Sequence, residues 1–138
     1  MPSQGLAAVQ SGRRWGYVDL DGHYVVQPQY DVAGDFSEEL AAVSLNGLYG
    51  YIDRSGLVVI PLQFYKALIF SEELAAVNTG DYDNPLWGYI GHSGRFAIEH
   101  QFIQAFHFHH GLALVRWPRR EGYIDRSGRI VKQWPTDF

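Results

Sequence analysis

The sequence Phe-Ser-Glu-Glu-Leu-Ala-Ala-Val at Phe36–Val43 recurs without change at Phe70–Val77. A second stretch, Gly-Tyr-Ile-Asp-Arg-Ser-Gly at Gly50–Gly56, recurs at Gly122–Gly128. A Gly-Tyr pair marks the same place in four segments, spaced 34, 38 and 34 residues apart, at Gly16, Gly50, Gly88 and Gly122. Self-similarity at such a period is typical of repeat proteins. The sequence therefore predicts one domain of four tandem copies, with approximate bounds 5–39, 40–73, 74–111 and 112–138.

Copy two shows the strand pattern of the unit. Leu40–Leu45 alternates as a short strand, and Asn46-Gly47 is a typical hairpin turn before a second strand at Leu48–Asp53. The next turn is expected at Asp53–Gly56, because the Asp side chain bonds nearby amides and Gly tolerates positive φ. A third strand at Leu57–Ile60 is expected to end at the following proline, which has no amide hydrogen for the ladder.

Each copy is thus predicted to be a three-stranded antiparallel meander plus a connector, which makes the domain all-β. One meander cannot bury both faces, so the copies must stack. The glycine in the middle of each second strand indicates a close approach by another group. The expected group is an aromatic ring lying across the bare backbone, and the candidates are Trp15, Tyr49 and Trp87.

Two polar residues distinguish copy four. Lys132 stands where the other copies carry Val26, Ile60 and Ile98, and Glu121 stands where they carry an aromatic residue. Polar replacements at apolar positions are typical of a terminal cap, which an open stack requires and a ring does not. The pattern favours an open solenoid-like stack over a closed propeller-like ring. The alternative is that both are edge positions that have diverged.

Composition excludes several classes of protein. An apolar fraction of 46% with 15% aromatic residues excludes intrinsic disorder, and a net charge of −4 argues against nucleic acid as a partner. Without cysteine the chain has no disulfide, thiolate metal site or thiol nucleophile. Met1–Val9 lacks the pattern of a signal peptide, and no apolar run approaches the ~20 residues of a membrane span. The expected location is therefore cytoplasmic.

The motifs together resemble the bacterial WG (or KWG) β-repeat family, named for the Trp-Gly found here at Trp15-Gly16 and Trp87-Gly88. The Gly-Tyr-Val/Ile-Asp strand, the Asp-x-x-Gly turn and the Phe-Ser-Glu connector carry the resemblance over nearly the whole chain. Copy two departs from it at Tyr49, copy three at Gly91 and at His109-His110, and copy four at Glu121. The resemblance implies a stacked β scaffold of the interaction type, without a shared catalytic residue or cofactor.

Candidate catalytic and metal-binding groups are explained better by the repeat. Glu38-Glu39 and Glu72-Glu73 hold the same place in their copies, which indicates solvated connectors rather than a pair of glycosidase carboxylates. His107, His109 and His110, with His100 nearby, are residues that bind zinc or nickel, but two of them replace Ser-Glu of the repeat. We expect no enzyme activity, no cofactor and no metal site.

Charged residues gather in the hairpin loops between the first two strands of the copies. The loops are basic in copies one and four and acidic in copy three, where four extra residues lie within Asn78–Leu86. Arg beside Trp or Tyr is enriched at protein interface hot spots, although a solvated loop edge is the alternative. The candidate partner-binding residues are Arg13, Arg14, Arg116, Trp117, Arg119, Arg120, Asp81, Tyr82 and Asp83.

These observations favour a non-catalytic scaffold that binds a protein partner, for example an inhibitor or immunity-like protein that blocks another protein. The alternative is a carbohydrate or cell-wall binding module in which exposed aromatic residues stack on sugar rings. Trp15 and Trp87 are expected to be structural, which would leave Trp117 and Trp134 free for a sugar.

Overall fold

The computed structural model describes residues 5–137, and every regular element in that part of the chain is a β-strand. The strands form four small antiparallel sheets, and none of these closes into a barrel or a ring. By its internal contacts the chain divides into two compact units, 1–63 and 64–138, each of which contains two sheets. The all-β class and the open repeat sheets are confirmed.

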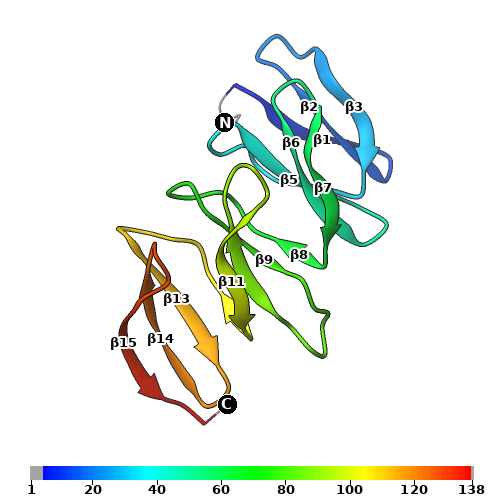
Figure 1. Ribbon diagram of the computed structural model, residues 1–138. Coiled ribbons are helices and arrows are strands. Elements are labelled where there is room, and N and C mark those ends of the chain that lie inside the picture. The colour runs from blue at the N-terminus through cyan, green and yellow to red at the C-terminus, as the bar shows by residue number, and fades with distance from the viewer. Residues whose placement is uncertain (1–4, 138) are drawn as a thin grey trace. The chain divides into compact units, whose positions relative to one another are not determined.

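The first unit holds copies one and two. Its first sheet has the order β1 (Ala7–Ser11), β2 (Arg14–Val18) and β3 (Tyr24–Tyr30). Its second sheet has the order β4 (Val32–Ala33), β5 (Leu40–Leu45), β6 (Leu48–Asp53) and β7 (Val58–Phe64), whose last residue already belongs to the second unit (Figure 1).

The second unit holds copies three and four, in two four-stranded sheets. One sheet consists of β8 (Lys66–Ala67), β9 (Ala75–Asn78), β10 (Trp87–Ile90) and β11 (Phe96–Phe102). The other consists of β12 (Gln104–Ala105), β13 (Leu112–Trp117), β14 (Arg120–Asp125) and β15 (Ile130–Pro135), and the last three lie side by side in Figure 1.

Both predicted turns of copy two are present. Leu45 pairs with Leu48 across Asn46-Gly47, and both turn residues have positive φ, as a type I′ hairpin requires. In the second turn, the Asp53 carboxylate accepts the amide hydrogens of Ser55 and Leu57 at 2.9 and 3.0 Å. The same arrangement recurs at Asp19 and Asp125.

The connector was predicted only as a crossing segment, but it also contributes a strand. The two-residue strands β4, β8 and β12 pair with the first long strand of the following copy, so these three sheets have four strands. The expected end of the third strand at Pro61 is also wrong, because β7 continues through it to Phe64. Strand β7 lies at the edge of its sheet, where a proline is tolerated because one side of the strand has no partner strand.

The pairing of β2 with β3 shows that the third strand has two more residues than the strand it pairs with. On β2, Trp15 and Tyr17 are two residues apart, but their partners on β3, Tyr30 and Val26, are four apart. The extra residues form a β-bulge that contains Pro28.

The backbone of the third strand, not an aromatic ring, covers the strand glycines, so the predicted ring-over-glycine packing is wrong. A Cβ atom added at Gly50 would lie 2.7 Å from the carbonyl carbon of Pro61 and from the amide nitrogen of Leu62. Gly16, Gly88 and Gly122 face the backbone of their own third strands in the same way. Glycine is required there because the two backbones touch.

The core of each unit is built across two copies around a repeated tyrosine. Tyr17 and Tyr89 are fully buried, and each hydroxyl donates to a backbone carbonyl of the following connector, Gly34 at 2.6 Å and Phe106 at 2.7 Å. Two residues further on, Phe36 and Phe108 pack edge-on against these rings, with centroids 4.9 Å apart in both cases. Burial also raises the pKa of both tyrosines above that of an exposed one.

Over residues 5–137 the structure contains no helix that has the length and apolar character needed to cross a membrane.

Candidate binding site

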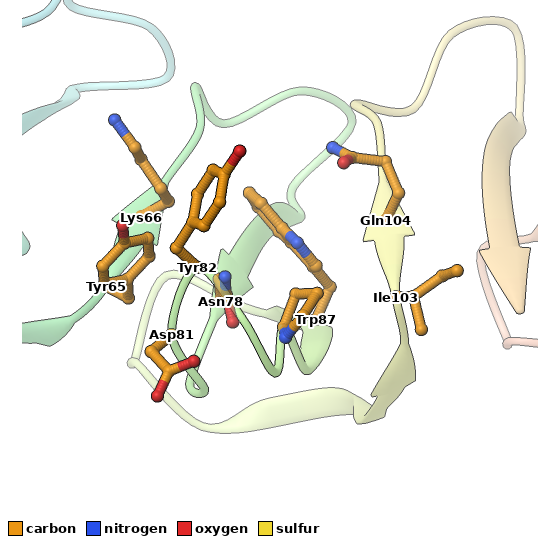
Figure 2. A pocket seen from close by; sticks show the side chains of 9 residues that line it. Tyr65, Lys66, Asn78, Asp81, Tyr82, Trp87, Ile103 and Gln104 are labelled. Carbon is orange, nitrogen blue, oxygen red and sulfur yellow. The ribbon is translucent and has the colours of Figure 1, made fainter. Parts of the chain in front are cut away.

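An open pocket of about 200 Å³ lies on copy three, beside the predicted acidic loop (Figure 2). Three of its side chains are aromatic rings, on Tyr65, Tyr82 and Trp87, and two carry opposite charges, Lys66 and Asp81. The remaining lining residues come from the base of the loop and from the connector to copy four: Asn78, Pro85, Ile103 and Gln104.

The buried side chain of Asn78 holds the base of the loop. It stands at the end of β9, opposite Trp87 on β10, and is 3% exposed. Its carbonyl oxygen accepts the amide hydrogens of Gly80 at 2.8 Å and Leu86 at 2.9 Å. Because both ends of the inserted segment are bonded to one buried group, the loop leaves the sheet in a defined direction.

The tip of the loop presents Tyr82 to solvent. The Asp81 carboxylate accepts the amide hydrogen of Asn84 at 2.7 Å, which closes a tight turn around Tyr82 and Asp83. Tyr82 is 82% exposed, the highest fraction among the large hydrophobic residues that are exposed in residues 5–137. Figure 2 shows its ring between those of Tyr65 and Trp87. Noncovalent contact with a ligand is the chemistry that these groups provide.

The predicted basic loops lie in different units, and most of their arginines have partners within their own copies or connectors. Arg14 forms an ion pair with Asp31 at 3.1 Å. Arg116 pairs with Glu121 at 2.6 Å and holds the pKa of that carboxyl below its usual value. Arg120 stacks on Trp117, 4.3 Å from the ring centroid, and bonds Gln133. Arg13 and Arg119 are exposed.

Tryptophan burial differs in part from the expectation. Trp87 is buried, as predicted, but the expectation that Trp117 is free is wrong because only 7% of it is exposed. Its ring packs edge-on against Phe102 of β11, with centroids 5.5 Å apart, in the core shared by copies three and four. Trp15 and Trp134 are half-buried.

The acidic pairs occupy tight turns rather than a catalytic cleft. Glu38, Glu39, Glu72 and Glu73 all have positive φ, and each pair is the two-residue loop of a type I′ turn. Glu72 accepts the amide hydrogen of Gly111 in the next copy at 2.9 Å, and Arg126 bonds Glu73 at 2.9 Å. In the second unit these carboxylates therefore bind groups from later copies.

The histidine cluster brings His109 and His110 into ring contact, with centroids 4.0 Å apart, and His107 lies 6.5 Å from His109. Across residues 5–137, the one set of three groups whose ligand atoms gather within 4.8 Å is Asp19, Asp21 and His23. It lies on an exposed turn, where the Asp19 carboxylate already accepts the backbone amides of the other two. The turn accounts for this cluster without a metal.

The turn aspartates make the stability of the protein sensitive to acid. Hydrogen bonds from Ser127 and from backbone amides lower the pKa of Asp125 to about 2, and similar bonds lower those of Asp19 and Asp53. A carboxyl whose pKa is lowered by folding stabilises the fold above its unfolded pKa, and this stabilisation is lost as the pH falls through the folded pKa.

We therefore expect the free energy of unfolding to fall between pH 4 and about pH 2, and to fall less steeply in Asp125→Asn. Urea unfolding at a series of pH values measures this. The two curves should be separated by a constant difference above pH 4 and approach each other as the pH falls to about 2. If the difference in unfolding free energy between the wild type and the variant does not depend on pH, the charge of Asp125 does not contribute to stability.

Sequence reasoning found only part of the pocket. Asp81 and Tyr82 were predicted, but Tyr65, Lys66 and Gln104 were not, because they lie on the connectors that flank copy three. The four-residue insertion was the available signal, since it is the one loop that lengthens the repeat.

Comparison with known proteins gives a match to one family model. The model of the WG containing repeat matches residues 15–49, 49–82 and 87–116. No curated protein matches the sequence significantly.

Proposed function

The chain belongs to the WG repeat family, which is not an enzyme family, and from this premise we propose that it binds a protein partner through the pocket on copy three. The observation that carries the proposal is the exposed ring of Tyr82 beside a preformed pocket with two further rings. Tyr and Trp dominate interface hot spots because they bury a large area with few rotatable bonds.

The pocket suits one anchoring side chain of a partner. A volume of about 200 Å³ is smaller than that of most drug-sized ligand sites, and Lys66 and Asp81 provide charged contacts of both signs at its rim. Asn78 fixes the loop in advance, so the partner need not pay the entropy of ordering it. The basic loops, through Arg13 and Arg119, are proposed as secondary contacts that steer an acidic partner.

An inhibitor or immunity-like protein is one version of this function, since occlusion of another protein requires only a rigid surface. Carbohydrate binding is the second candidate, and the same pocket supports it. Tyr82 and Tyr65 offer rings for stacking on a sugar, and Asp81 and Gln104 offer polar groups for its hydroxyls.

The test is affinity capture with the wild type and Tyr82→Ala, using Tyr24→Ala as a matched control. Tyr24 is also exposed but lies on β3 in the other unit. We expect Tyr82→Ala to weaken partner binding at least about tenfold, as hot-spot residues do, while Tyr24→Ala binds like the wild type.

The affinities are then measured with the purified partner by surface plasmon resonance. Equal binding by Tyr82→Ala and the wild type would refute the pocket as the binding site. Binding to a glycan array that is lost in Tyr82→Ala, without a captured protein, would establish the carbohydrate candidate instead.

A further inference from the structure

The repeated tyrosine of copy four differs from those of the other copies. Tyr17, Tyr51 and Tyr89 are 0% exposed, but Tyr123 is 40% exposed. Tyr123 holds the same place in its sheet, since it pairs with Lys132 as Tyr17 pairs with Val26 and Tyr89 with Ile98. The difference therefore lies in what covers the ring.

In copies one and three, two residues of the following connector cover the tyrosine ring, and they are two positions apart in the sequence. A backbone carbonyl accepts the tyrosine hydroxyl, and the phenylalanine two residues later packs edge-on against the ring, as Gly34 and Phe36 do on Tyr17. Phe106 and Phe108 repeat this on Tyr89 with nearly the same distances. An extended segment with this two-residue spacing is thus what the tyrosine face accommodates.

A third contact involves the strand next to the tyrosine. A Cβ atom added at the turn glycine Gly128 of copy four would lie 3.3 Å from Ile98 of copy three, and Gly56 of copy two approaches Val26 of copy one in the same way. At this position copy four carries the exposed Lys132. The sheet face that carries the repeated tyrosine is therefore aromatic and basic in copy four, whereas Val26 and Ile98 make it aromatic and aliphatic in copies one and three.

The exposed face of copy four is held in shape. Among residues 5–137, no carbonyl and no phenylalanine take the two places on Tyr123; its ring contact is with Trp134, whose centroid lies 5.8 Å away. The Trp134 indole donates to Glu121 at 3.1 Å, and Arg116 bonds the same carboxylate at 2.6 Å. We name Tyr123, Lys132 and Trp134 the copy-four face; its Trp134 ring is held by the bond to Glu121, which lies on the same side of the sheet.

We propose that the copy-four face binds an extended acidic segment of a partner protein that carries a phenylalanine two residues after the carbonyl bonded by Tyr123. The internal contacts of copies one and three supply the geometry, and Lys132 supplies the preference for acid. The connector phenylalanines of a second copy, Phe36, Phe70 and Phe108, are buried in its own fold and do not fill this place. The site is separate from the pocket on copy three.

The probe is a synthetic peptide with the sequence of residues 32–40, Val-Ala-Gly-Asp-Phe-Ser-Glu-Glu-Leu, which contains the carbonyl, the phenylalanine and three carboxylates. It is titrated into the ¹⁵N-labelled full chain and followed by NMR. We expect saturable shifts of the Trp134 indole and of the Tyr123 and Lys132 amides. Binding should weaken about tenfold when the peptide phenylalanine is replaced by alanine, and similarly in Lys132→Glu.

Tyr82→Ala should bind the peptide like the wild type, so failure of this site and failure of the pocket are distinguishable. Equal binding of the alanine peptide, shifts confined to other residues, or no saturable shift would overturn the proposal. Shifts of the same three residues that depend on protein concentration without peptide would also overturn it, because the occupant would then be a second copy.

Discussion

Gly50→Ala is expected to destabilise the protein by about 3 kcal/mol, the upper part of the usual range for overpacking. The added methyl group would lie 2.5 Å from the Ile60 carbonyl oxygen and 2.7 Å from two further backbone atoms. Backbone cannot rotate away as a side chain does, so β7 must separate from β6 around Ile60 and Pro61. Urea unfolding followed by circular dichroism measures the loss.

Gly91→Ala is the matched control. Gly91 has no positive φ, and a Cβ atom added there has no heavy atom within 4 Å. Its substitution should therefore leave stability unchanged or raise it by up to about 1 kcal/mol, because alanine restricts the unfolded chain. Equal effects at Gly50 and Gly91 would contradict the backbone contact between the second and third strands.

Tyr89→Ala is expected to cost about 3 to 5 kcal/mol, as large truncations of buried aromatic residues do. It removes the hydroxyl bond to Phe106 and the edge-on contact with Phe108, so both contacts of this ring with the connector to copy four are lost. Tyr89→Phe keeps the ring and should cost about 1 to 3 kcal/mol, since the buried carbonyl loses its donor.

Tyr123→Ala provides the comparison at the same place in the repeat. Its ring is 40% exposed, and we expect its substitution to cost much less than that of Tyr89. Thermal and urea unfolding of the three variants give the differences. A cost at Tyr123 as large as that at Tyr89 would show that the face of copy four is already covered in solution.

The repeat and its turns were predictable from sequence because they depend on local chemistry. Asn46-Gly47 and the aspartate turns have their own signatures, and identical peptides such as Phe36–Val43 and Phe70–Val77 fix the period. The third strand was not predictable to its end, because the proline rule applies to paired positions and the position of Pro61 at a sheet edge is a tertiary property. The glycine contact was misassigned for the same reason.

The candidate site was predictable only where the sequence departs from its own repeat. The insertion around Asp81 and Tyr82 stood out, whereas Tyr65 and Gln104 occupy ordinary connector positions that become pocket walls only in the folded unit. Trp117 illustrates the opposite error, because a residue beside a basic loop was expected to be exposed and instead packs on Phe102.

The bond from the repeated tyrosine to the connector that leads to the next copy has a consequence for how such a protein changes over generations. Its acceptor is a main-chain oxygen, belonging to glycine at one junction and to phenylalanine at the other, so the junction does not depend on which side chain the acceptor residue carries. The acceptor residue of a connector can therefore be substituted while the hydrogen bond from the tyrosine is kept. A duplicated copy would bring its own tyrosine and its own connector, so this bond would form again in a lengthened array.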